Sequence, residues 1–235
     1  MFTLLRSHTL AAAAVAIGLV TAPIAALADT LTYQGYTVTN GKNVTITAPI
    51  TLGVSAGRIV LDNVFINGVG VADINAWCID LTNTLLGQGS FGLGNMTDPA
   101  IRNQLNALLT GAASLDLNAG MNSAAVQVAV WKTVVTNFTM NTTVTNGSAI
   151  NTLANSFITN VNTAGNSTWK ASNTMQIVSL DPVSPLANQR LITLVPGAPN
   201  NNNSTNIPEP ASMAMIAVGL IGLGVARRLR RRTLH

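Results

Sequence analysis

Hydrophobic and polar residues alternate with a period of two in the part of the chain that follows residue 28. Aliphatic side chains alternate with threonines over residues 44–48, and a second alternating stretch covers residues 59–65. Such alternation is typical of β-strands, in which successive side chains point to opposite faces. Turn-forming residues bound these stretches, namely Asn40-Gly41, Gly53, Gly57 and Gly68. The pattern therefore predicts short strands here, and residues 74–81 form a further candidate strand.

A helical period replaces this alternation in the middle of the chain. Asp98 followed by Pro99 is typical of a helix start, and the hydrophobic residues behind them share one face up to Gly111. A second helix is predicted over residues 123–135, beginning at a serine; it is hydrophobic nearly all round and should be buried. A third helix, capped by a serine, is predicted over residues 148–164.

Short strand-like segments return at residues 175–180 and 190–195. The glycine-rich segment 87–94 has no helix behind it, so we expect a flexible loop there and not a phosphate-binding turn. Strands that precede and follow a group of helices predict an α+β fold. The expected architecture is a β-rich domain, sandwich or barrel-like, with a helical insert over residues 29–196.

The first 28 residues have the three parts of a secretory signal peptide. Arg6 precedes an apolar stretch over residues 10–20, and Ala26-Leu27-Ala28 supplies the small residues of a cleavage site. The apolar stretch is too short to span a membrane and is followed by Pro23. We therefore predict that residues 1–28 direct export and that signal peptidase removes them.

The C-terminal end also has three parts, behind an asparagine-rich linker at residues 197–206. The segment begins with Pro208-Glu209-Pro210, continues with an apolar run at 211–226 and ends in an arginine cluster at 227–232. Sixteen apolar residues span about 24 Å as a helix, which is marginal for a hydrocarbon core of roughly 30 Å. The arginines would hold their end on the cytoplasmic side.

This arrangement resembles the PEP-CTERM sorting signal of Gram-negative bacteria, which an exosortase recognises. For residues 207–235 the resemblance implies transient anchoring in the inner membrane through residues 211–226, followed by cleavage near Pro208-Glu209-Pro210. It also implies delivery to the cell surface or extracellular matrix.

Charge and residue types exclude several classes of function. The formal net charge is +4, but six of the twelve basic residues lie in the terminal segments, which leaves no basic stripe for nucleic acid. Both histidines, His8 and His235, are also terminal, and the single glutamate is Glu209. Catalysis by histidine or glutamate and zinc binding by histidine therefore lack their residues. The aspartates of the domain are not spaced as a known ligand loop, so we expect no metal, no cofactor and no enzymatic turnover.

The single cysteine, Cys78, cannot close a disulfide within the chain. It is inert and buried, paired with another chain, or reactive. Its context is Trp77-Cys78-Ile79-Asp80, and the second predicted helix carries Val126-Gln127-Val128-Ala129-Val130-Trp131. The two motifs together resemble the thioester domains of bacterial surface adhesins, which carry an internal bond between a cysteine and a glutamine. In the first motif, Trp77 stands where that family usually has Tyr, Phe or Leu.

The resemblance implies a role for each matching residue. Cys78 would be the thiol and Gln127 the acyl donor, while Trp131 would form a wall of the pocket. The rest of the pocket would consist of Trp77, Ile79, Asp80 and Ala129. A helix that begins at Ser123 would place Gln127 in its first turns, where the positive end of the helix dipole favours negative charge on the attacking sulfur and the carbonyl oxygen.

Two functions remain as alternatives. In the first, an exported surface or matrix protein uses an internal thioester for covalent attachment to an amine or hydroxyl of a partner molecule. In the second, the fold is a relic without the bond, and the protein is a structural component of the matrix. The composition, rich in asparagine and threonine, and sequons such as Asn43-Val44-Thr45 favour this second function.

Overall fold

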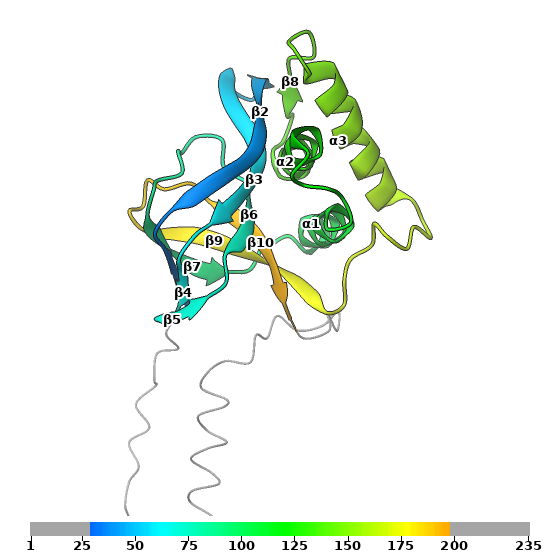
Figure 1. The fold of residues 1–235 in the computed structure, drawn as a ribbon. Coiled ribbons are helices and arrows are strands. Elements are labelled where there is room, and N and C mark those ends of the chain that lie inside the picture. The colour runs from blue at the N-terminus through cyan, green and yellow to red at the C-terminus, as the bar shows by residue number, and fades with distance from the viewer. Residues whose placement is uncertain (1–28, 198–235) are drawn as a thin grey trace, which may run out of the picture. The chain divides into compact units, whose positions relative to one another are not determined.

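The protein is represented by a computed structural model that describes residues 29–197, which lie within one compact unit, Ala28–Ile207 (Figure 1). The predicted signal peptide at 1–28 and the sorting segment at 207–235 lie outside the described residues, as does the linker apart from Gly197. Among the described residues no helix is long and apolar enough to cross a membrane, and the predicted span at 211–226 lies outside them.

The strands of the described domain form one antiparallel sheet of ten strands. Their order is β5-β4-β1-β7-β9-β10-β6-β3-β2-β8. The strands are β1 (Thr30–Tyr33), β2 (Tyr36–Ala48), β3 (Leu52–Leu61), β4 (Val64–Ile66), β5 (Val69–Val71), β6 (Ile74–Cys78), β7 (Gly89–Gly94), β8 (Thr139–Met140), β9 (Met175–Ser184) and β10 (Leu191–Pro196). The predicted α+β class, a β-rich domain with a helical insert, is confirmed.

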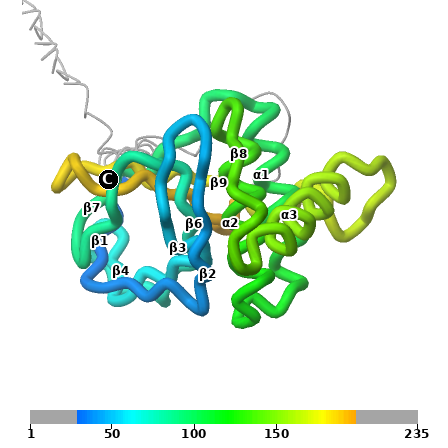
Figure 2. Tube along the Cα trace, turned by 90° about the horizontal axis from the view of Figure 1, so that it is seen from above, coloured from blue at the N-terminus to red at the C-terminus, as the bar shows by residue number. Residues whose placement is uncertain are grey.

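Three helices of the described domain lie together on one side of the sheet (Figure 1). They are α1 (Pro99–Ala112), α2 (Gly120–Val134) and α3 (Gly147–Asn162). The view from above shows the same separation, with the helices beside the β2–β3 hairpin (Figure 2). The central helix, α2, packs against β2, β3 and β6 and against both other helices. Because neighbours surround it, every residue from Ser123 to Trp131 is buried, as its even hydrophobicity predicts.

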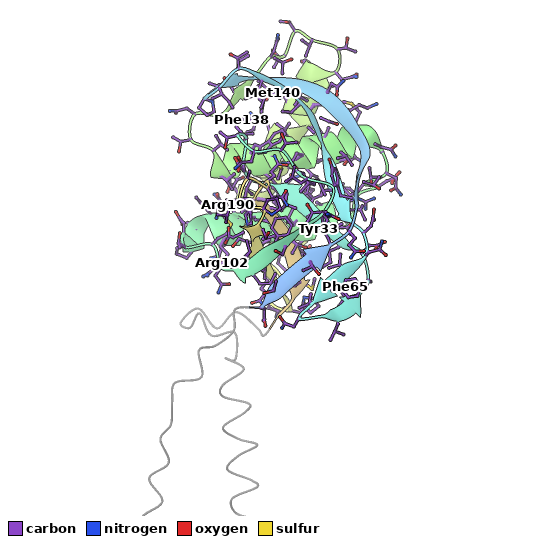
Figure 3. The ribbon with its side chains drawn as sticks, turned by 90° about the vertical axis from the view of Figure 1, so that its left-hand side faces the viewer. Tyr33, Phe65, Arg102, Phe138, Met140 and Arg190 are labelled. Atoms are coloured by element: carbon purple, nitrogen blue, oxygen red, sulfur yellow. The ribbon has the colours of Figure 1, made fainter. Side chains whose placement is uncertain are left out.

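Stacked aromatic rings mark three parts of the core. Tyr33 of β1 stacks on Phe91 of β7 at 5.4 Å, Trp131 stacks on Phe138 at 5.9 Å, and Phe157 stacks on Trp169 at 4.9 Å. Figure 3 shows Phe138 and Met140 near the β8 edge and Phe65 at the opposite end, beside β5. The core therefore continues from the sheet into the space between the sheet and the helices.

The predicted loop at residues 87–94 is wrong, because β7 occupies Gly89–Gly94 between β1 and β9. Phe91 anchors this strand and is completely buried. The glycines serve close packing and not flexibility: a Cβ atom at Gly89 would lie 2.7 Å from Nδ2 of Asn188, and one at Gly94 would lie 2.6 Å from Oδ2 of Asp181. Strands β1, β5 and β8 have two to four residues each, too few to show a periodic pattern.

Helix starts differ from their predictions in two of three cases. At α1, the Asp98 carboxylate accepts hydrogen bonds from the N–H groups of Ala100 and Ile101, as a cap should. The predicted start of α2 at Ser123 is wrong by three residues, because the helix begins at Gly120. At α3 the cap is Asn146, which has a φ of 65°, and not the predicted Ser148.

Candidate functional site

Cys78 is the last residue of β6, just beyond the point where the hydrogen-bonded pairing of β6 with β3 ends. Ile79 donates its backbone N–H to the Arg190 carbonyl at 3.1 Å. Because backbone groups alternate between the two sides of a strand, those of Ile79 point to β10 and those of Cys78 point to the β3 side. The pairing of β6 with β3 stops at Ala76, opposite Ile59. The N–H and C=O groups of Cys78 therefore have no strand partner on that side.

Gln127 of α2 supplies the missing partner. Its Oε1 accepts a hydrogen bond from the Cys78 N–H at 3.0 Å, and its Nε2 donates to the Cys78 carbonyl at 2.8 Å. Only this orientation of the carboxamide satisfies both backbone groups. Because its two polar atoms bond the groups on either side of the Cys78 Cα atom, the carboxamide carbon faces that Cα, two bonds from the sulfur. The structure thus brings together the two residues that the sequence motifs single out.

The Cys78 thiol is buried, and burial favours its protonated form. The residue is 4% exposed, and its Sγ–H donates to the carbonyl of Asp80 at 3.7 Å. Burial raises the pKa of the thiol far above its usual value; the Asp80 carboxylate adds to this rise, and the hydrogen bond to the Asp80 backbone opposes it. The expectation of a thiolate stabilised by a helix N-terminus is not met. With α2 beginning at Gly120, Gln127 lies about two turns into the helix.

Asp80 organises the turn that follows Cys78. Its carboxylate accepts hydrogen bonds from the Thr82 N–H at 2.8 Å, the Thr82 hydroxyl at 2.7 Å and the Asn83 amide at 2.6 Å. Partial burial raises the pKa of this carboxyl, but the hydrogen bonds from Thr82 and Asn83 outweigh it, and the pKa lies below its ordinary value. The Asp80 carbonyl, which meets the thiol, also accepts Nε2–H of Gln189 at 2.9 Å.

Of the other predicted pocket residues, Trp77, Ala129 and Trp131 are buried in the core. Trp77 is 4% exposed and pairs with Ile192 of β10, whereas Ile79 is half-buried beyond the end of β6. Ala129 is completely buried on α2. Trp131 lies one turn after Gln127, where its ring stacks on Phe138 and its indole Nε1–H has no hydrogen-bond acceptor among the described residues.

Ser123 belongs to the same helix face and was expected only as a helix start. It is completely buried, and its hydroxyl accepts the Arg58 N–H at 2.7 Å and donates to the Thr39 carbonyl at 3.4 Å. Thr39 lies where the register of β2 and β3 shifts. Ser123 and Gln127, four residues apart, thus each bond sheet backbone. This spacing in the sequence could have shown that the serine shares the face of the glutamine.

Comparisons with known proteins concern the C-terminal segment and the fold. A family model for the PEP-CTERM protein-sorting motif matches residues 206–232, which confirms the predicted motif around Pro208-Glu209-Pro210. The motif implies an exported protein that is sorted to the cell surface. The chain has no match among curated proteins.

The fold is similar to a solved structure, the N-terminal domain of the Streptococcus pyogenes pilus tip adhesin Cpa. The sequence identity is 11% and the TM-score is 0.42, over 72% of this chain and 94% of that chain. At this identity the likeness concerns the fold alone.

Proposed function

We propose that this exported surface protein forms an internal thioester between Cys78 and Gln127, and that the bond serves covalent attachment to a nucleophile on a partner molecule. The observation that carries the proposal is the pair of hydrogen bonds between the Gln127 carboxamide and the Cys78 backbone. These bonds hold a buried carboxamide beside the residue that bears the thiol, so little rearrangement would be needed for the two groups to react.

Formation of the bond balances with the groups present. The Cys78 sulfur attacks the carboxamide carbon of Gln127, the Sγ–Cδ bond forms, and the bond from Cδ to Nε2 breaks. The thiol proton leaves on Nε2, and ammonia is released. The thiol itself supplies the proton that the leaving nitrogen needs.

The backbone can stabilise the charge that develops in this step. As sulfur adds to the carboxamide carbon, negative charge collects on Oε1, which accepts the Cys78 N–H at 3.0 Å. A fixed backbone donor in a buried site is the arrangement that stabilises an oxyanion. Burial of both residues, at 4% and 1% exposure, also keeps water from hydrolysing the product.

Attachment to a partner breaks the thioester bond and transfers the acyl group of Gln127 to the partner. An amine or hydroxyl of the partner adds to the acyl carbon of Gln127, the Sγ–Cδ bond breaks, and the sulfur regains a proton. Each protein molecule reacts once, so the proposal describes a covalent binding module and no turnover enzyme. Signal peptidase and an exosortase are its proposed processing partners.

The alternative is a non-reactive structural matrix protein with a relic thioester fold. One observation favours it: the Gln127 carboxamide completes the β6 ladder, so the contact has a structural purpose without any chemistry. The intact mass of the mature protein separates the two, because loss of ammonia lowers the mass by about 17 Da. Gln127→Ala and Cys78→Ser are the controls, since neither should show the deficit. Wild-type protein of full mass with a titratable thiol would favour the relic.

The proposed route to the surface has its own test. Peptide mapping of protein taken from the cell surface should give a chain that begins at Asp29 and lacks residues 227–232. An intact arginine tail on the surface protein would contradict the sorting proposal.

A further inference from the structure

The segment between β6 and β7 begins beside the thiol. Residues 79–88, all in the described part of the chain, form neither helix nor strand. The segment starts at the site, because the Asp80 carbonyl accepts Sγ–H of Cys78 at 3.7 Å. Cys78 is only 4% exposed. A nucleophile from outside therefore reaches the acyl carbon only if some of the residues packed around Cys78 move.

A buried asparagine fastens the far end of this segment. Asn188 is completely buried, and its Oδ1 accepts the N–H groups of Leu86 at 3.0 Å and of Gln189 at 2.9 Å. Its Nδ2 donates to the Tyr33 hydroxyl at 2.9 Å, and that hydroxyl donates to the Leu86 carbonyl. Both backbone groups of Leu86 are therefore bound by side chains from β1 and from the turn before β10.

Few other bonds attach the segment to the rest of the fold, apart from the Ile79 N–H, which bonds the Arg190 carbonyl at 3.1 Å, and the side chain of Leu85, which is buried in the core. Gln189 donates Nε2–H to the Asp80 carbonyl at 2.9 Å, and the Tyr36 hydroxyl donates to the Leu85 carbonyl at 3.3 Å. Beyond Ile79 no strand ladder holds residues 79–88, and a segment held mainly by single side-chain bonds opens at a lower free energy than a strand held by a ladder. Removal of one such bond should therefore open residues 79–88 while the sheet stays intact.

We propose that residues 79–88 are a lid over Cys78 and that Asn188 and Gln189 hold it closed. The lid excludes water from the acyl carbon in the free protein, and a partner gains access when the lid opens. This regulation rests on the proposed function, although the closure itself can be measured on the thiol alone.

The test compares two buried asparagines. Asn106 of α1 is 1% exposed, and like Asn188 it fastens a loop, through the N–H of Ser172 at 2.8 Å and the carbonyl of Met175 at 2.8 Å. Met175 pairs with Pro196, five residues along β10 from Leu191, which faces Cys78. Five residues of strand are about 16 Å, so Asn106→Ala removes an equivalent anchor far from the thiol.

Wild type, Asn188→Ala, Asn106→Ala and Gln189→Ala are each incubated with methylamine until their masses are constant. This frees Cys78 wherever it was acylated and leaves a free thiol unchanged. Native alkylation of Cys78 by iodoacetamide is then followed by mass, and urea unfolding gives the stability of each variant. Asn188→Ala should raise the alkylation rate about tenfold or more over wild type, because it removes the acceptor of the Leu86 N–H and the donor to the Tyr33 hydroxyl that bonds the Leu86 carbonyl. Gln189→Ala, a milder change at a half-buried site, should raise it less.

Asn106→Ala should leave the rate near that of wild type once its loss of stability is taken into account. Hydrogen exchange should show the same division: the Leu86 amide loses protection in Asn188→Ala, and the Ser172 amide loses it in Asn106→Ala. Equal rates for the two asparagine variants at equal stability would overturn the lid, as would unchanged rates in both Asn188→Ala and Gln189→Ala. The mass before methylamine reports the thioester separately, so either proposal can fail without the other.

Discussion

Helices α1 and α2 each bury one carboxamide against backbone from a distant part of the chain. Asn106 and Gln127 are both 1% exposed. Asn106 bonds Ser172 and Met175, 66 and 69 residues away, and Gln127 bonds Cys78, 49 residues away. In each case the oxygen accepts an N–H and the nitrogen donates to a carbonyl, so the two side chains satisfy backbone groups that no strand pairs.

The two sites differ in what lies beside the carboxamide. Around Asn106 the neighbouring groups are hydroxyls, since Thr110 donates to its Oδ1 at 3.1 Å. Beside Gln127 the bonded residue carries a thiol, which is a far better nucleophile than a hydroxyl. A buried carboxamide that bonds distant backbone is therefore common to α1 and α2, and the proposed chemistry needs the cysteine that only the Gln127 site has.

The largest expected effect comes from removing either carboxamide. Compared with wild-type protein in which the thioester has not formed, Gln127→Ala leaves the buried N–H and C=O of Cys78 without partners and should lower the free energy of unfolding by about 2 to 4 kcal/mol. Asn106→Ala should cost a similar amount. Urea unfolding measures both losses.

Mass then separates the two variants. Asn106→Ala should keep the deficit of about 17 Da, whereas Gln127→Ala should have its full calculated mass. If both variants lost the deficit, thioester formation would depend on overall stability and not on Gln127 itself. The proposed difference between the two carboxamides would then be wrong.

A smaller loss is expected when the helix is released from the sheet at Ser123. Ser123→Ala leaves the Arg58 N–H without its acceptor and should cost about 1 to 3 kcal/mol. Because Ser123 lies one turn before Gln127, the variant should also form thioester more slowly during refolding, as the mass deficit against time measures. A variant that loses stability but forms the bond at the wild-type rate would show that Ser123 holds the helix without positioning the glutamine.

Removing the thiol should cost least among the buried changes. Cys78→Ala leaves both hydrogen bonds of the Gln127 carboxamide in place, because they involve only the Cys78 backbone. Relative to wild-type protein in which the thioester has not formed, the loss should be about 1 to 2 kcal/mol, as for a small truncation in a core. Incorporation of methylamine, followed by mass, should disappear completely in this variant. Incorporation that persisted would mean that Gln127 is not the acyl donor.

Periodicity and caps predicted the parts of the fold that depend on local chemistry. The Asp98-Pro99 start of α1 is confirmed because a side-chain cap is a local interaction. The start of α2 was misplaced because its serine bonds sheet backbone from two other strands. Likewise the sequence predicts a loop where β7 lies, because its glycines make room for side chains about 90 residues away. Long-range contacts decide both cases, and a sequence pattern does not contain them.

At the site, the two motifs identified Cys78 and Gln127, and the structure places them in contact. The sequence could not show how they meet, because the open ladder beyond Ala76 results from the end of the β3 pairing. Asn188 and Gln189 had no sequence signal at all. They lie 110 and 111 positions after Cys78 in an irregular turn, and only the fold brings them to the segment that follows Cys78.

The smallest expected effect is a response to acid that distinguishes the two loops. In the folded state the pKa of Asp80 lies below its ordinary value, so the charged form is the one that the fold stabilises. Its contribution is fully present above the unfolded pKa of about 3.9 and is lost as the pH falls through the lower folded pKa. Below that range the Thr82 amide, bonded to the Asp80 carboxylate, should lose protection from hydrogen exchange. The Ser172 amide, bonded to the neutral Asn106 carboxamide, should keep it. Asp80→Asn should abolish the difference in pH response between the two amides, and its persistence in that variant would assign it to another group.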